Sequence, residues 1–455
     1  MSSKHYSAAI MKRPLLFLAL IPLTLWGVFA LPDVLAANPE GPWAWRKPLI
    51  ILSGLLALWW MSAGILLATR SPWLEQRFGG LDKLYRLHKN IGIGAGLLVF
   101  THWMIEWLPK NLSKAGLITG PRGPRGPRGE PDMWIDLAKD VGEWAGYILL
   151  ALVVVALVKR IPYRYFRWVH KAFGAVFLAG AFHGLMLMPT TFWQSPLGWL
   201  TAALAAAGLV PALLSLSNRI GRKRQHSAQI VSISQHDGKL LEMVCRPEKN
   251  WPGHKAGQFL FANFGSRGEG AHPFTIASAW NAQEGTLTLA IKALGDFTAQ
   301  LPALIEAGQT ITLEGPYGAF DFSPKIPVDR GNAAHQVWVA GGIGITPFLA
   351  RLEQLAAAPA PTKATADLFY CTPNAAPGDF PEHLEALCDA AGVRLHRRQT
   401  DNTGPLTPQE VASTLRPDST VWFCGPAAWG RSLGQALQAS GLSRAAFHQE
   451  AFEFR

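Results

Sequence analysis

Cysteine is scarce in this chain of 455 residues, and its placement narrows the kinds of site the chain can build. The four cysteines, Cys245, Cys371, Cys388 and Cys424, all lie in the second half, at spacings that match no metal-binding motif. We therefore expect reduced thiols in a reducing compartment, and no cysteine-ligated metal centre.

A basic face of the kind that binds nucleic acid is also missing, although the formal net charge is +11. Lys and Arg gather instead at the ends of long apolar segments. This distribution is typical of a membrane protein that keeps positive charge on the inner side. We expect a lipid membrane as a partner and no nucleic acid.

Long apolar runs dominate the first half of the chain. Six segments approach the ~20 residues that span a bilayer as a helix; they lie at 14–36, 48–69, 88–108, 141–158, 168–188 and 196–216. The first could be a signal peptide that ends near Leu35-Ala36-Ala37, but its length and internal proline favour a retained helix. Residues 1–221 thus predict a membrane all-α six-helix bundle.

The loops predict the orientation of this bundle. With the N-terminus inside, the inner loops hold more Lys and Arg than the outer loops do. We expect a multi-pass protein of the cell (inner) membrane, with a cytoplasmic N-terminus and a cytoplasmic second half. A Gly-Pro-Arg repeat at 120–131 in the outer loop predicts an extended spacer, or a patch that attracts anions.

Four histidines lie within the apolar segments as two similar pairs, His88 with His102 and His170 with His183. His88 and His170 each begin the pattern His-Lys-x-x-Gly, so the two segments form an internal repeat. On a helix, the spacing of the first pair leaves about 40° between the side chains and roughly 21 Å along the axis. The spacing of the second pair leaves about 140°, which requires a bulge, a bend or a wide flat ligand.

An ionisable side chain deep in an apolar segment is costly, which makes His102 and His183 functional candidates. Taken alone, His88 or His170 could equally be an interfacial side chain near a helix end. Four imidazoles paired across two helices at two depths favour two stacked b-type haems, each with two histidine ligands. A zinc site would need four ligands at one depth.

The second half of the chain has the patterns of a soluble protein. Short alternating runs between about 226 and 325, such as those at 229–233 and 286–291, predict an antiparallel β-barrel over 222–330. From about 334, strands alternate with helices, which predicts an α/β doubly wound nucleotide-binding domain over 331–455. Thr346-Pro347 and Thr407-Pro408 mark two helix starts, each with a threonine as N-cap.

A glycine-rich turn, Gly341 to Pro347, follows a buried strand and opens a helix. Glycines let the backbone approach a pyrophosphate, and the helix N-terminus offers unpaired N–H groups to it. The pattern is not G-x-G-x-x-G, and such a turn alone can be a plain tight turn. A second turn, Cys424-Gly425-Pro426, is expected on the same carboxyl edge of the sheet, beside the nicotinamide.

The run His272 to Ser278 lies in the barrel half. In this run, an aromatic ring that can stack on a flavin is adjacent to a hydroxyl that can bond a flavin ring nitrogen. A polar residue nearby can bind a phosphate. Without other support it would be a strand with proline at its edge.

Together with Gly295-Asp296-Phe297-Thr298 and Gly315 to Gly318, these motifs resemble the ferredoxin-reductase-type module for FAD and NAD(P)H. Joined to the paired histidines, the chain resembles the NADPH oxidase and ferric reductase superfamily in its bacterial single-chain form. The resemblance implies three binding sets. They are His272, Pro273, Phe274, Thr275, Gly295, Asp296, Phe297 and Thr298 for FAD; Gly341, Gly342, Gly344, Thr346, Pro347, Cys424, Gly425 and Pro426 for the nicotinamide nucleotide; and His88 with His170 and His102 with His183 for the inner and outer haem.

Within these sets, the resemblance implies that Phe274 packs on the isoalloxazine and that Thr275 bonds near its N5 atom. Cys424 would lie beside the nicotinamide, and either Phe452 or Phe454 would cover the flavin.

The chain departs from the family pattern at two places. The superoxide-forming oxidases tend to carry a further histidine one turn after the outer ligand, and Glu106 stands there. An arginine for the 2′-phosphate is often found where this chain has Pro373-Asn374, so the choice between NADH and NADPH stays open, with Arg397 and Arg398 as substitutes.

The resemblance predicts electron transfer from cytoplasmic NAD(P)H through FAD and two haems to a small-molecule acceptor outside, either a ferric chelate or dioxygen. No obligatory protein partner is evident. Two other hypotheses remain open: a membrane-anchored flavin reductase without haem, and a haem protein that exchanges electrons with quinone.

Overall fold

The computed structural model describes residues 4–39, 41–119, 132–158, 160–161, 163–236, 240–265, 270–323, 335–358, 366–373 and 383–450. The chain divides into two compact units. The first comprises Met1–Leu74 and Leu84–Ile220, and the second comprises Glu75–Lys83 and Gly221–Arg455. The second unit contains both sheets.

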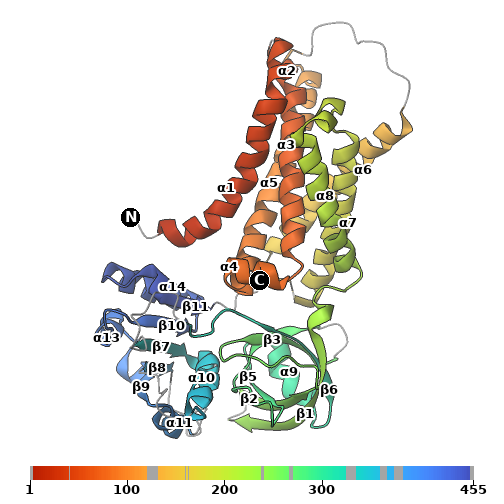
Figure 1. Cartoon of the computed structure of the whole chain (residues 1–455). Helices are drawn as coiled ribbons and strands as arrows, with labels where there is room; N and C mark the ends of the chain where they lie inside the picture. Colours follow the sequence, from red (N-terminus) through yellow and green to blue (C-terminus); the bar gives the residue numbers. More distant parts are fainter. Residues whose placement is uncertain are drawn as a thin grey trace. The chain divides into compact units, whose positions relative to one another are not determined.

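The first unit is helical, and its long helices lie side by side as a bundle (Figure 1). Among the described residues, five helices are long and apolar enough to cross a membrane, and the apolar helical segment Arg13–Phe29 is shorter. The sixth span is therefore still a prediction. The helices are α1 (Lys4–Phe29), α2 (Leu31–Ala36), α3 (Gly41–Leu67), α4 (Pro72–Phe78), α5 (Leu81–Lys114), α6 (Met133–Leu157), α7 (Tyr163–Met186) and α8 (Pro196–Leu216).

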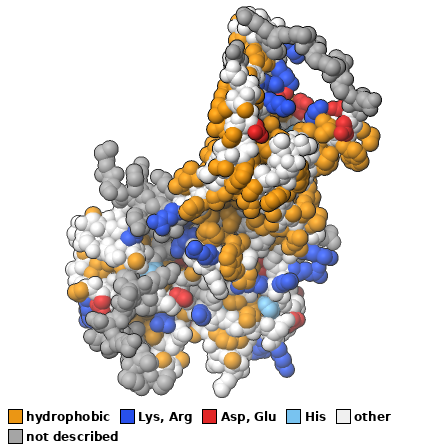
Figure 2. Space-filling view, turned by 45° about the horizontal axis from the view of Figure 1, so that its top comes forward, with side chains coloured by type: hydrophobic (Ala, Val, Ile, Leu, Met, Phe, Trp, Pro, Cys, Tyr) orange, Lys and Arg blue, Asp and Glu red, His pale blue; other side chains and the backbone are white. Residues whose placement is uncertain are grey.

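Large apolar side chains face outward on this unit. Phe100, Trp144 and Val210 are examples, with 45%, 68% and 62% of their surface exposed. Hydrophobic side chains cover most of the visible helical surface in Figure 2. A water-facing surface would not carry such a patch, whereas a helix surrounded by lipid does.

The first sheet of the second unit has six antiparallel strands in the order β4-β3-β6-β1-β2-β5. They are β1 (Gln225–His236), β2 (Leu240–Pro247), β3 (Phe259–Asn263), β4 (His272–Thr275), β5 (Leu287–Lys292) and β6 (Thr310–Tyr317). A single bridge between Ile276 and Leu289 links the two ends of this order. The predicted antiparallel sheet is confirmed, and full closure into a barrel stays a prediction.

The second sheet is parallel, in the order β11-β10-β7-β8-β9. Alternate strand residues pack on opposite faces: Trp338 and Trp422 lie in one core cluster, and Val339 and Phe423 lie in another. The strands are β7 (Gln336–Gly341), β8 (Ala366–Thr372), β9 (Val393–Gln399), β10 (Thr420–Cys424) and β11 (Phe447–Glu450).

Helices cover both faces of this sheet, as a doubly wound fold requires (Figure 1). Residues of α10 (Thr346–Ala356) and α11 (Leu384–Ala391) join the core of one face, and residues of α13 (Pro408–Ala412) and α14 (Ala427–Ala439) join the other. The short helices α9 (Asp296–Gln300) and α12 (Thr400–Thr403) complete the unit.

One of the two predicted helix caps is present, and the other is wrong. Thr407 and Glu410 bond reciprocally at the start of α13, as a capping box does. Thr346 is instead the first residue of α10, because a 3₁₀ turn (Gly342–Ile345) leads directly into the helix. Its hydroxyl donates backward to the carbonyl of Ile343.

The segment Glu75–Lys83, which comprises the end of α4 and the first residues of α5, belongs to the second unit. A buried carboxylate links it to that unit. Oε1 of Glu75 accepts from the backbone N–H of Gly318 at 2.7 Å, and Oε2 accepts from Arg224 at 3.1 Å. Arg224 also lies over the ring of Tyr317. The GPYG motif at 315–318 thus serves in part to hold this segment.

Asp367 is the centre of a buried polar network at the amino edge of the parallel sheet. It accepts from His335 at 2.9 Å and from His396 at 2.7 Å. Burial by itself would raise the pKa of Asp367, but the hydrogen bonds from His396 and His335 hold it below its usual value. The carboxylate is therefore charged at neutral pH.

We expect Asp367→Asn to destabilise the second unit by about 2 kcal/mol at neutral pH, because both histidines lose a charged acceptor. A carboxyl with a lowered folded-state pKa stabilises the fold above its unfolded pKa, and this contribution is lost as pH falls below about 4. Thermal unfolding at pH 7 and pH 3 checks both points. Asp389→Asn, at an exposed site, is the control, and equal melting temperatures of wild type and Asp367→Asn at pH 7 would contradict the expectation.

Candidate functional site

The four candidate haem histidines meet in two pairs between α5 and α7. The ring centroids of His88 and His170 lie 5.9 Å apart, and those of His102 and His183 lie 6.2 Å apart. The ring planes are 67° and 86° apart, respectively. A bulge in α7, one explanation offered for the spacing of its histidines, is wrong, since Tyr163–Met186 are α-helical throughout.

Three of the four imidazoles bond to backbone carbonyls through Nδ1. His88 bonds to the carbonyl of Gly64 at 2.9 Å and His102 to that of Ile50 at 3.0 Å, both on α3. His183 bonds to the carbonyl of Ala138 on α6 at 2.8 Å. A carbonyl can only accept, so Nδ1 carries the proton and Nε2 keeps its lone pair for a metal.

His170 differs from the other three. Its Nδ1 is buried and has no hydrogen-bond partner in the described part of the chain. Phe166 and Phe173 lie against the ring, with centroids 5.0 Å and 4.9 Å away. Packing rather than a hydrogen bond therefore orients this imidazole.

Two glycines make room for the pair His102 and His183. A Cβ atom at Gly142 would overlap with the ring of His183, and one at Gly54 would lie 3.1 Å from Cε1 of His102. The sequence contains no pattern that marks these two glycines or the three carbonyls, because their role depends on which helices become neighbours.

The spacing of the rings fits one metal ion between each pair. An imidazole nitrogen lies about 2 Å from a metal that it ligates and roughly 1 Å from its own ring centre, so two rings on opposite sides of one ion have centroids about 6 Å apart. Both pairs have this separation. The donor set and the spacing therefore fit a haem iron at each level.

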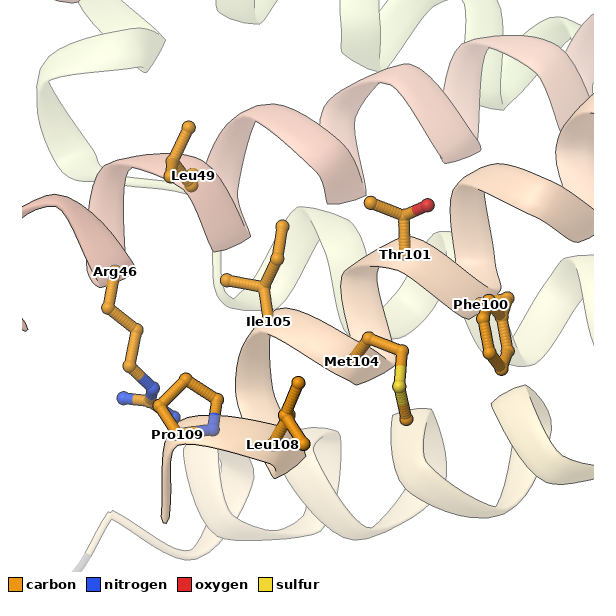
Figure 3. A pocket seen from close by; sticks show the side chains of 8 residues that line it. All are labelled: Arg46, Leu49, Phe100, Thr101, Met104, Ile105, Leu108 and Pro109. Atoms are coloured by element: carbon orange, nitrogen blue, oxygen red, sulfur yellow. The ribbon is translucent and has the colours of Figure 1, made fainter. Parts of the chain in front are cut away.

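A cavity of about 480 Å³ lies between α3 and α5, next to the turn that carries His102 (Figure 3). Apolar side chains line most of it, with Arg46 at one end. Arg46 and Lys110 both form ion pairs with Glu106. The residue that departs from the family pattern is thus held between two cations.

The two sequence motifs expected to bind FAD lie together in the second unit. The ring of His272 on β4 stacks on Phe297 of α9, with centroids 4.1 Å apart and planes 9° apart. The hydroxyl of Thr298 accepts from the backbone N–H groups of Leu294 and Gly295, which shapes the turn before α9. Asp296 is the first residue of that helix.

Phe274 and Thr275 occupy the end of β4. Phe274 packs against the core of the antiparallel sheet and contacts Phe264 edge-on at 6.1 Å, and Thr275 is 8% exposed. Pro273 pairs with Phe261 in the neighbouring strand.

The two turns expected to hold the nicotinamide nucleotide are in direct contact. β7 and β10 pair in parallel with Ala340 opposite Cys424, so both strands end at one edge. A Cβ atom at Gly344 would overlap with the carbonyl of Cys424, and the backbone of Gly341 lies 3.3 Å from the Cβ position of Gly425. Gly342 has φ +55°, a conformation that favours glycine. A proline lies at the start of the helix after each turn. Pro426 directly precedes α14, and Pro347 is the second residue of α10.

The thiol of Cys424 lies in the hydrophobic core and is 0% exposed. Burial raises the pKa of the Cys424 thiol well above its usual value, so the thiol is neutral. In this structure the residue contributes its backbone to the turn.

The remaining predicted residues fall into two groups. Phe452, Phe454 and Asn374 lie outside the described residues. Arg398 is occupied by the carbonyls of Thr403 and Gly404 and by an ion pair with Glu410. Arg397 lies 3.5 Å from Glu385 and is half-exposed.

Glu450, at the end of β11, is a buried ionisable group that the sequence analysis missed. The residue is 4% exposed, and its Oε2 has no hydrogen-bond partner among the described residues. Burial, and next the charge of Asp82, raise the pKa of Glu450 well above its usual value. Its position immediately before the C-terminal aromatic residues was the available signal.

Two family descriptions match the chain. Residues 53–181 match the ferric reductase like transmembrane component, and residues 225–321 match an FAD-binding domain. The first match contains three of the four paired histidines, and the second contains the His272 and Gly295 motifs. Both matches, in this order along one chain, make the chain similar to the NADPH oxidase and ferric reductase superfamily.

Relatives in this superfamily are distant. The chain is 26% identical over 234 residues to the heavy chain of a superoxide-generating NADPH oxidase of Dictyostelium discoideum, covering 47% of this chain and 42% of the relative. It is 27% identical over 376 residues to human NADPH oxidase 3, covering 68% and 63%. Ferric reduction oxidase 8, mitochondrial, of Arabidopsis thaliana is 27% identical, covering 46% and 27%. The chain spans less than two thirds of the length of these relatives.

We expect Gly142→Ala to remove about half of the bound haem, since one of two levels loses its ligand geometry when the added methyl displaces His183. Gly146→Ala on the same helix is the matched control, because among the described residues its added methyl would meet Val99 alone, at 3.9 Å. Haem content per protein measures the effect. Equal haem content in the two variants would contradict this role for Gly142.

We expect Gly344→Ala to weaken NAD(P)H binding about tenfold, because the added methyl pushes the two turns apart. The FAD content should not change, since the FAD motifs lie on the other sheet. Nucleotide titration followed by flavin absorbance measures both. Unchanged nucleotide affinity in a folded variant would show that the contact of the turns is not needed for binding.

Proposed function

We propose that this protein transfers electrons from NAD(P)H through FAD and two b-type haems to a small-molecule acceptor on the opposite side of the membrane. The N-terminus and the second unit are cytoplasmic in this proposal, and the membrane is the cell (inner) membrane. The two imidazole pairs, each with the separation required for one metal ion, are the observation that carries it.

The chain's own residues hold and orient the carriers. His88 and His170 would hold one haem, and His102 and His183 the other, with Nε2 available in the three rings whose Nδ1 bonds to a carbonyl. His272 with the 295–298 turn, Phe274 and Thr275 would hold FAD. The 341–347 and 424–426 turns would hold the nucleotide. When bound, FAD accepts a hydride and passes on single electrons, which a haem iron can carry.

The charges near the outer pair bear on the acceptor. Arg46, Glu106 and Lys110 together carry an excess of one positive charge. A cationic group attracts an anionic acceptor, which favours a ferric chelate over neutral dioxygen. One relative is named for superoxide generation and another for ferric reduction, and both names are consistent with the proposed electron transfer.

Visible spectra of the purified full chain test the proposal. We expect a dithionite-reduced, six-coordinate b-type spectrum, and we expect His102→Ala or His183→Ala to remove the outer component, about half of the signal. His88→Ala should remove the other half. His236→Ala, in the second unit, is the control and should leave the spectrum unchanged.

A spectrum with flavin alone would overturn the proposal and support a membrane-anchored flavin reductase. Oxidation of NAD(P)H with ferric chelates, dioxygen and quinones, each added outside sealed vesicles, then identifies the acceptor.

A further inference from the structure

A second cavity, of about 620 Å³, lies at one end of the antiparallel sheet. Its wall comes from the start of β1, the connection between β2 and β3, the residues after β4 and the end of β6. The side chains that matter here are Lys223, Arg224, His226, His254, Lys255 and Trp280. None of the residues assigned to FAD, to the nucleotide or to haem lines this cavity.

The charge of the cavity is positive and largely uncompensated. No Asp or Glu among the described residues lines it. Arg224 is paired with Glu75, but Lys223 and Lys255 are exposed and form no ion pair within the described part of the chain. Two free ammonium groups at the rim of one cavity are suited to a phosphate group.

The inner wall provides a hydrogen-bond acceptor beside aromatic rings. Nε2 of His254 donates to the carbonyl of Ser278 at 3.0 Å, so Nδ1 is the acceptor, and it is buried with no partner among the described residues. Burial lowers the pKa of His254, which keeps the ring neutral. The ring of Trp280 lies 5.4 Å from that of His254. A hydroxyl group on the ligand would satisfy this nitrogen.

In the chain, the residues of this cavity begin soon after a candidate membrane span. α8 ends at Leu216, and the cavity begins at Lys223. Even fully extended, this stretch covers only about 25 Å. Arg219 and Arg222 add further positive charge to it. Basic residues directly after a span are typical of contacts with anionic lipid.

We propose that this cavity binds the headgroup of an anionic membrane phospholipid of the phosphatidylglycerol type. Lys223 and Lys255 contact the phosphodiester, and Nδ1 of His254 accepts from a headgroup hydroxyl. The lipid would anchor the first strand of the antiparallel sheet at the membrane surface. This role is independent of electron transfer, because it uses none of the residues proposed to hold a carrier.

Native mass spectrometry of the detergent-purified full chain tests the proposal by titration with phosphatidylglycerol and, separately, with phosphatidylcholine. We expect selective retention of phosphatidylglycerol, and we expect Lys223→Gln with Lys255→Gln to weaken it at least about tenfold. The matched control is Arg246→Gln with Arg416→Gln, which removes the same charge elsewhere in the second unit. FAD content reports whether each variant is folded.

Three outcomes would overturn the proposal. One is equal loss of lipid in the two double variants, which would show a general charge effect. Another is equal retention of the two lipids by the wild type. The third is displacement of phosphatidylglycerol by free glycerol phosphate at similar concentration, which would assign the cavity to a soluble phosphate compound rather than to a lipid.

Discussion

The imidazole N–H in an apolar helix is the constraint on which the first unit depends. A polar group without a partner costs several kcal/mol in lipid, so an acceptor on a neighbouring helix lowers the cost of placing a histidine inside a span. Ile50 and Gly64 on α3 and Ala138 on α6 supply three such acceptors. The same bonds leave Nε2 free for a metal, so the arrangement that lowers the cost of burial also prepares a ligand.

Close backbone approach is the matching constraint in the second unit. The turns at Gly344 and Gly425 pack against each other because neither carries a side chain. Gly142 and Gly54 do the same for imidazoles in the helices. In both units glycine removes volume at a point where two segments must meet, which is a packing role rather than a matter of chain flexibility.

Two of the buried carboxyl groups in the second unit, Asp367 and Glu450, illustrate how partners decide charge. Asp367 accepts from two histidines and stays ionised, whereas Glu450 has an oxygen without a partner in the described chain and favours its neutral form. Burial acts in the same direction on both, whereas the hydrogen bonds and the neighbouring charges differ. The amino-acid composition does not show which of these two carboxyl groups is charged.

The sequence by itself determined the helical first half and the antiparallel and parallel sheets, and it supplied the candidate site residues, because hydrophobic period and turn residues are local properties. It identified His88 with His170 and His102 with His183, since spacing along a helix sets depth. Only the tertiary structure decided which carbonyls orient those rings, that Gly142 clears space for His183, that Arg398 is used internally, and that Glu75 joins the second unit. Each of these depends on contacts between segments distant in the chain, and no local pattern encodes which segments become neighbours.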